Sequence, residues 1–306
     1  MPLTPRLALL LTLPPLLWAG NAVIGRLAVT QIAPLQLNAL RWLLALLLLL
    51  PLGWRAFSGP QRRQQVIDRL PHLAALGLVG VGAYNALQYL ALTTSTPLNV
   101  TLLASSSPVW MMAVGALFHG VRPRRSQWLG AVLSLAGVAV VLGRGQLAAL
   151  AEVRLVAGDL LMMAAIIAWA FYSWMLAKPP ASLQGARRPD WNWAEFLFIQ
   201  VVFGLLWAAS GALAEFTLWP DEKPVVWSGW LLAALAYVAI GPSLIAYRCW
   251  GIGVAASGPA VAAFFGNLTP LFAAVLSALA LGEWPQPYHA AAFALIVGGI
   301  VVSTRS

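Results

Sequence analysis

The chain has 306 residues, of which 61% are hydrophobic and only 9% are charged, and its formal net charge is +9. Soluble globular domains carry about a quarter charged residues, so this composition excludes them and indicates a chain that lies in lipid. The basic excess indicates loops that face anionic headgroups, and we expect no nucleic-acid partner. The single cysteine, Cys249, has no thiol partner and no metal-ligand spacing, so we expect no disulfide, metal or cofactor.

Stretches of roughly 20 mostly apolar residues, the length that a helix needs to cross the hydrocarbon layer, follow one another along the chain. We predict ten spans, at 7–29, 34–54, 73–92, 98–118, 126–143, 155–177, 193–213, 228–250, 258–280 and 287–303. The first stretch also resembles a secretory signal peptide, with Arg6 before it and Ala19 and Gly20 as a cleavage site. The apolar run continues to Val29, which favours a retained helix. The predicted fold class is an all-α integral membrane protein.

Arginines and lysines are unevenly divided between the two sets of alternating loops. One side has only Arg144, Arg154 and Lys223. The other side, which includes both termini, has Arg6, Arg55, Arg62, Arg63, Arg69, Arg122, Arg124, Arg125, Lys178, Arg187, Arg188, Arg248 and Arg305. Cytoplasmic loops of membrane proteins are enriched in these residues, so we expect both termini in the cytoplasm.

Residues that bend or end helices recur at a spacing of 162 positions. Without a gap, this spacing pairs Ser95, Pro97, Pro108, Gly120 and Gly137 with Ser257, Pro259, Pro270, Gly282 and Gly299. A weaker match at another offset pairs Trp18 with Trp169. We therefore predict two five-helix repeats, at 1–147 and 148–306. Because each repeat crosses the membrane an odd number of times, the second is inverted, which is typical of transporters.

Several of these segments carry a family resemblance. They are Leu17-Trp18-Ala19-Gly20-Asn21, Arg41, the helices of Pro108 and Pro270, and Leu281-Gly282-Glu283. The chain resembles the EamA family of the drug/metabolite transporter superfamily, and within it most resembles the YddG-type aromatic amino-acid exporters. One departure is visible: Gly120 is followed by Val121 where Gly282 is followed by Glu283. The resemblance implies an exporter of the bacterial inner membrane that works by alternating access, with a small-molecule substrate and no obligate protein partner.

Polar and aromatic side chains at bilayer depth tend to face a cavity or another helix, because exposing polar groups to lipid is costly. The candidate substrate-binding residues are Trp18, Asn21, Tyr84, Asn85, Gln88, Ser105, Trp169, Tyr172, Ser243, Tyr247 and Asn267. Pro108 and Pro270 are candidate helix kinks, because proline releases a backbone carbonyl. Aromatic faces with a few hydrogen-bonding groups suit an aromatic amino acid. The alternative is that these residues only join one helix to another. The family resemblance favours the first interpretation, because it implies that the helices that carry these residues line the central pathway.

Charged residues within the spans are few. Arg26 and Arg41 are expected close to the outer surface, where a long side chain can reach the headgroups or a carbonyl, so we interpret them as structural. Asp159 and Glu195 are expected near span ends, which leaves the middle of the membrane without a carboxylate. Proton antiport through a buried acid needs such a group. The sequence therefore predicts uniport or weakly coupled efflux.

Other functions fit less well. No phosphate-binding glycine loop that ends in Lys and Ser or Thr is present, which argues against an ATP-driven pump. An intramembrane enzyme stays as a minor alternative, but His72, His119 and His289 lie near span ends without paired acids. We expect no enzymatic activity. A broad-specificity drug/metabolite exporter of the same superfamily is the nearer alternative to an amino-acid exporter.

Overall fold

The structure is a computed structural model that describes residues 4–28, 30–95, 97–146, 148, 154–218, 225–281 and 286–305. The α-helices are α1 (Pro5–Ala28), α2 (Pro34–Gly53), α3 (Gly59–Ile67), α4 (Leu70–Leu76), α5 (Tyr84–Thr94), α6 (Pro97–Ala104), α7 (Ser107–His119), α8 (Arg125–Leu142), α9 (Ala157–Ala177), α10 (Trp193–Leu218), α11 (Gly229–Val238), α12 (Ala246–Ser257), α13 (Pro259–Gly266), α14 (Thr269–Leu281) and α15 (Pro287–Thr304). Two π-helical turns, η2 (Gly77–Ala83) and η6 (Ala239–Ile245), continue α4 into α5 and α11 into α12. Short 3-10 turns follow α2 and α9: η1 (Trp54–Phe57), η4 (Ala181–Leu183) and η5 (Gly185–Arg187).

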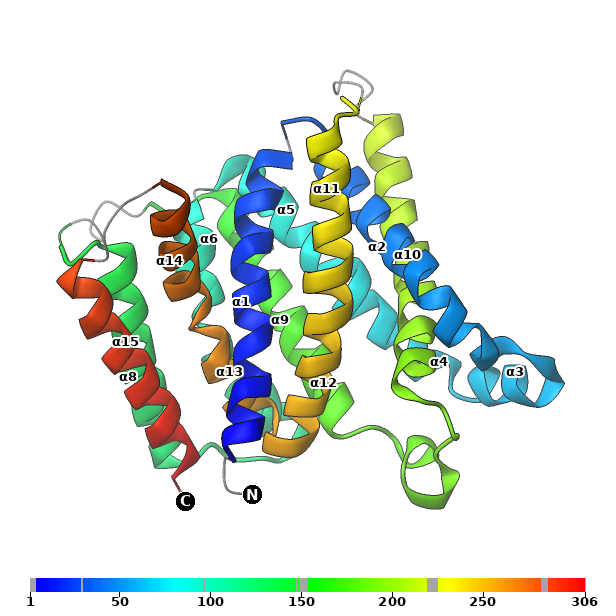
Figure 1. Ribbon diagram of the computed structural model, residues 1–306. Coiled ribbons are helices and arrows are strands. Elements are labelled where there is room, and N and C mark those ends of the chain that lie inside the picture. The colour runs from blue at the N-terminus through cyan, green and yellow to red at the C-terminus, as the bar shows by residue number, and fades with distance from the viewer. Residues whose placement is uncertain are drawn as a thin grey trace.

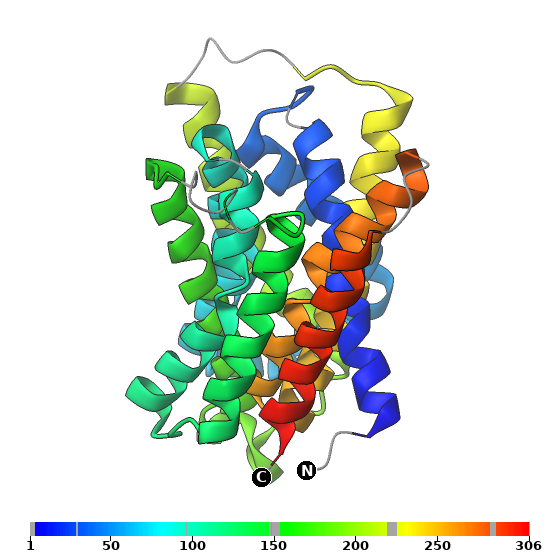
Figure 2. The ribbon, with the colours of Figure 1, turned by 90° about the vertical axis from the view of Figure 1, so that its left-hand side faces the viewer.

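Ten helical segments of the described chain are long and apolar enough to cross a membrane, which confirms the predicted number. They run up and down through one bundle, and both ends of the chain lie at the same end of it (Figure 1; Figure 2). We call this the terminal end, and the opposite one the distal end. The chain therefore folds as two five-helix repeats of inverted topology, as the sequence predicts.

Some spans are longer than predicted. The third runs over Leu70–Thr94, the seventh over Trp193–Leu218 and the eighth over Gly229–Ser257. A charged residue was expected close to the end of the eighth span, but α12 continues past Arg248. The Arg248 guanidinium stacks on the Trp193 ring at 4.1 Å, so the charge is accommodated against a neighbouring helix.

Departures from α-helical geometry recur in both repeats at the predicted spacing of 162 residues. The turn η2 begins at Gly77 and η6 at Ala239, and both span seven residues. The fourth span breaks between α6 and α7, just before Pro108, and the ninth breaks between α13 and α14, just before Pro270. Proline lacks the amide that would continue the helix, so these breaks follow from the sequence. The two halves therefore have the same irregular elements at matching positions.

Pairs of helices from different repeats pack together. The helix α8 lies along α15 at the left edge of the bundle in Figure 1, the side that faces the viewer in Figure 2, and α2 lies along α10 (Figure 1). A side-chain carbon on Gly130 would come within 2.7 Å of the Gly299 carbonyl, and one on Gly299 within 2.7 Å of the Gly130 carbonyl. Small residues allow such close approach, which is the usual means of helix association in lipid. Some residues of the sequence argument lie outside the described part: Val29, Lys223, Gly282 and Glu283, together with the side chains of Arg26, Pro97 and Leu281.

Candidate functional site

A central cavity of about 130 Å³ lies among α1, α5, α6, α9 and the break between α13 and α14. It reaches toward the distal end, because Leu92, near the distal end of α5, and Val100, near the start of α6, both line it. Eight residues proposed from the sequence line this cavity: Trp18, Asn21, Tyr84, Asn85, Gln88, Ser105, Trp169 and Pro270. The cavity wall therefore combines aromatic rings with amides and hydroxyls.

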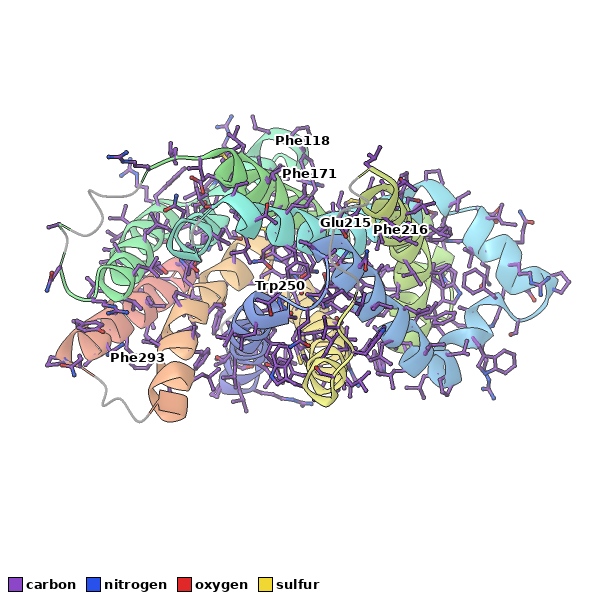
Figure 3. All side chains as sticks on the ribbon, turned by 90° about the horizontal axis from the view of Figure 1, so that it is seen from above. Phe118, Phe171, Glu215, Phe216, Trp250 and Phe293 are labelled. Carbon is purple, nitrogen blue, oxygen red and sulfur yellow. The ribbon has the colours of Figure 1, made fainter. Side chains whose placement is uncertain are left out.

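An aromatic cluster lies at the terminal side of this cavity, with Trp169 at its centre. The Trp169 ring contacts five other rings at centroid distances of 5.0–5.4 Å, those of Trp18, Tyr84, Tyr172, Tyr247 and Trp250. The Trp18 and Trp169 rings, which the repeat pairs, meet edge to face at 5.3 Å. Trp250 lies in the interior of the bundle when it is seen from above (Figure 3). Such pairs each add about 0.5–1.5 kcal/mol beyond area burial, so the cluster is a stable closure.

Hydrogen bonds fix the orientation of the clustered rings. The Trp250 indole N–H donates to Ser173 Oγ at 3.0 Å, and the Tyr172 hydroxyl donates to Gln200 Oε1 at 3.1 Å. The Tyr247 hydroxyl donates to the Gly80 carbonyl in the π-helical turn η2. The irregular backbone of η2 thus provides an acceptor at the centre of the bundle.

A second cavity of about 290 Å³ lies nearer the terminal end, between α9, α10 and α12. Its walls include Tyr172 and Tyr247 from the cluster, and Gln200, Trp193 and Arg248 from the surrounding helices. Because Trp169 and Trp250 line the central cavity while Tyr172 and Tyr247 line this one, the cluster separates the two. The two cavities therefore lie on either side of the aromatic cluster.

Arg41 does not lie near the surface, so the expectation of a side chain that reaches the headgroups is wrong. It is fully buried, at 0% exposure, between helices. Its Nε donates to Ser243 Oγ at 2.6 Å, and its Nη1 donates to Asn85 Oδ1 at 2.8 Å, to the Tyr89 hydroxyl at 3.1 Å and to Asn21 Oδ1 at 3.3 Å. A buried charge is tolerated only where hydrogen bonds surround it, and three helices provide them here.

Other predicted residues lie away from the central cavity. Ser243 is buried in η6, where it accepts from Arg41 and donates to the Val238 carbonyl at 2.7 Å. Asn267 lies in the break between α13 and α14 and donates to Ser134 Oγ at 2.8 Å on α8. Neither lines the two cavities described above. Pro108 is buried at the first turn of α7, so it belongs to the helix break.

Sequence reasoning did not select Gln200 or Trp250. Gln200 is an amide within the apolar helix α10, a signal of the same kind that selected Gln88. Trp250 was placed at the end of a predicted span, but α12 continues to Ser257 and buries the ring. If the end of this helix had been predicted correctly, Trp250 would have been selected as an aromatic residue within the membrane.

The buried carboxylates of the described residues lie near helix ends. Asp159 accepts from Ser95, from Asn99 Nδ2 at 3.0 Å and from the amide of Val156, at the start of α9. Glu195 accepts from Arg62 at 2.8 Å and from the Asn192 amide at 2.8 Å, at the start of α10. Both bind backbone amides at helix amino termini, where a negative charge is favourable.

A third buried carboxylate, Glu215, was not singled out from the sequence. It accepts from the backbone amides of Leu35 and Gln36 at 3.0–3.1 Å, and so joins α10 to the start of α2. Its label in Figure 3 lies beside the start of α2. All three carboxylates therefore have structural partners.

Comparison with known proteins identifies the family. The EamA-like transporter family matches residues 6–143 and again residues 156–305. The chain belongs to this family. It is 28% identical to an uncharacterized transporter of Archaeoglobus fulgidus, over 97% of this chain and 96% of that protein. It is 30% identical to the aromatic amino acid exporter YddG of Ancylobacter novellus, over 74% of each chain.

Two further similarities extend the comparison. The EamA-like chain is 26% identical to the uncharacterized inner membrane transporter YedA of Escherichia coli strain K12, over 94% of this chain and 87% of that protein. A solved crystal structure superposes with a TM-score of 0.71 at 25% identity, covering 97% of this chain and 96% of the other. The ten spans and the family together make this chain a multi-pass membrane transporter of the EamA type.

Proposed function

We propose that this EamA-like transporter exports small metabolites, chiefly amino acids with aromatic side chains, across the bacterial inner membrane by alternating access. The observation that carries the proposal is the central cavity, whose wall combines the aromatic cluster with the side-chain amides of Asn21, Asn85 and Gln88. Stacking on Trp169 and Tyr84 would hold a substrate ring. The amides and the Ser105 hydroxyl would bind its ammonium and carboxylate groups.

Two of the similar proteins support an amino-acid substrate. One is the aromatic amino acid exporter already named, and the other is a probable terminal-alkyne amino-acid exporter of Streptantibioticus cattleyicolor, 25% identical over 81% of this chain and 78% of that protein. Catalysis is not part of the proposal, because binding and reorientation suffice for transport. No obligate protein partner is proposed.

In the proposed cycle the two repeats, 1–147 and 148–306, move relative to each other. The central cavity would connect with the distal side in one state and with the larger cavity at the terminal end in the other. The aromatic cluster would open and close between them. We place the terminal end in the cytoplasm, because the arginine-rich loops lie there. A cysteine at Gly59, which has φ +80° and no neighbour within 4 Å of an added carbon, should react with a membrane-impermeant maleimide only in inverted vesicles.

The buried acids in the described part of the chain all bind helix termini, so the proposed transport runs down the substrate gradient without obligatory proton exchange. A pH gradient across proteoliposomes should not drive uphill accumulation of tryptophan. Uphill accumulation that collapses on addition of a protonophore would refute this part of the proposal.

Counterflow in proteoliposomes with a panel of amino acids tests the substrate class. The protein should exchange tryptophan, phenylalanine and tyrosine at least tenfold faster than alanine or glutamate. Trp169→Ala and Tyr84→Ala should each lower tryptophan exchange at least tenfold. The matched control is Phe293→Ala, which removes a ring that is 52% exposed on α15, at the edge of the bundle (Figure 3). Equal exchange of the whole panel, or an equal effect of all three substitutions, would refute the proposal.

A further inference from the structure

We propose that Arg41 is the carboxylate-binding residue of the central cavity, so that the transported compounds are selected for a carboxylate. This inference rests on the proposed function and narrows its substrate class. Arg41 lies directly behind the cavity wall, because three of its hydrogen-bond acceptors, on Asn21, Asn85 and Tyr89, belong to residues that line the cavity. Movement of one of these side chains would bring the guanidinium to the substrate.

No described carboxylate forms an ion pair with Arg41. Its four hydrogen-bond acceptors among the described residues are the neutral oxygens of two amides and two hydroxyls. Among the described residues the ion pairs involve Arg62, not Arg41. The Nη2 atom is buried and has no hydrogen-bond partner in the described part of the chain. A buried cation with a free donor is therefore available to an incoming anion, and a carboxylate fits the planar fork of donors at Nη1 and Nη2.

The inverted repeat shows that helix packing alone does not require an arginine here. Arg41 is the eighth residue of α2, and the eighth residue of α10, the corresponding helix, is Gln200. The repeat spacings also pair Asn21 with Tyr172 and Asn85 with Tyr247. In the second half the Tyr172 hydroxyl donates to Gln200, and these neutral side chains join α9 to α10, the pair that corresponds to α1 and α2. Neutral side chains can therefore make this helix-to-helix contact, and packing does not explain why the first half has a charged residue at this position.

The distances indicate how a carboxylate would bind. The Asn85 amide oxygen lies 2.8 Å from Nη1, and Asn85 itself lines the cavity. A substrate carboxylate would replace this oxygen at Nη1 and place its second oxygen on Nη2. The substrate ring would then lie against Tyr84 and Trp169, which line the same cavity. Compounds that have the ring without the carboxylate would lack the partner of the buried charge.

The test compares counterflow of tryptophan with that of tryptamine, which lacks only the carboxylate. The wild type should exchange tryptophan at least tenfold faster. Asn85→Asp keeps the size of the side chain, so this variant should fold. It supplies an internal carboxylate 2.8 Å from Arg41 Nη1, which should occupy the carboxylate site and abolish the preference for tryptophan over tryptamine. Arg41→Gln should abolish it as well, and Arg41→Lys, which keeps the charge without the fork, should retain only part of it.

The matched control is Arg63→Gln, which removes an exposed arginine at the terminal end and should leave the preference unchanged. Monodisperse elution in detergent verifies the fold of each variant. The proposal is overturned if the wild type exchanges tryptamine as fast as tryptophan, or if Asn85→Asp retains the wild-type preference. Exchange of both compounds at equal rates would leave the aromatic substrate class standing, whereas exchange of neither would refute the proposed function together with this inference.

Discussion

Gly80 offers a direct test of how the aromatic cluster is supported. It lies in η2, and an added side-chain carbon would lie 2.4 Å from Cδ2 and 2.5 Å from Cε2 of the Tyr172 ring. Those distances are far inside van der Waals contact, so Gly80→Ala forces the ring or the π-helical turn to move. Overpacking of this kind costs about 1–3 kcal/mol. The Gly80 carbonyl also accepts from the Tyr247 hydroxyl, and the same displacement weakens this bond.

We expect Gly80→Ala to lower the free energy of unfolding by about 2 kcal/mol and to lower tryptophan exchange severalfold. Gly298→Ala is the control, because Gly298 lies within α15 and an added carbon there meets no atom within 4 Å. That substitution should be neutral or stabilise the helix by up to about 1 kcal/mol. Denaturant unfolding in micelles and counterflow give the two readouts. Equal stability and equal exchange of the two variants would refute the steric argument.

Two further predictions concern hydrogen bonds. Glu215→Ala removes the acceptor of the Leu35 and Gln36 amides. Because hydrogen bonds to a charged group contribute about 1.5–3 kcal/mol, the free energy of unfolding in micelles should fall by about 3 kcal/mol. A fall of less than about 1 kcal/mol would contradict this prediction. Tyr172→Phe removes the donor to Gln200 but keeps the ring, so it should cost about 1–2 kcal/mol of stability and leave tryptophan exchange within about twofold. Loss of exchange in Tyr172→Phe would show that the hydroxyl itself is needed for transport.

The parts of the fold that the sequence predicts are those set by local chemistry. Hydropathy and length determine the ten spans, and Pro108 and Pro270 determine where the fourth and ninth spans break. The π-helical turns could not be predicted, because no residue type marks them. The segment Gly77–Ala83 contains three glycines, whereas its counterpart Ala239–Ile245 contains one glycine and a proline. These turns depend on tertiary partners, such as Tyr247, which bonds to the Gly80 carbonyl.

The site could be predicted only in part, for a similar reason. The cost of polar groups in lipid selects Asn21 and Gln88, which line the cavity, but it selects Asn267 equally, although that side chain binds Ser134. Which neighbour a polar residue faces depends on contacts distant in sequence. Arg41 was misplaced because its depth was judged from the sequence alone. It lies roughly 10 Å along α2 from the start, and neighbouring helices rather than lipid surround it.

The difference in charge between the two halves bears on the substrate affinity at each side of the membrane. Arg41 in the first half and Gln200 in the second are each the eighth residue of corresponding helices, so the two halves differ in charge at this position. A bound carboxylate favours whichever conformational state brings it to Arg41. The free energy of this preference equals the difference in binding free energy between the two states. Such a preference sets the substrate affinity on each side of the membrane, but it cannot drive net movement. Without a second coupled ion, net export requires a higher substrate concentration in the cytoplasm.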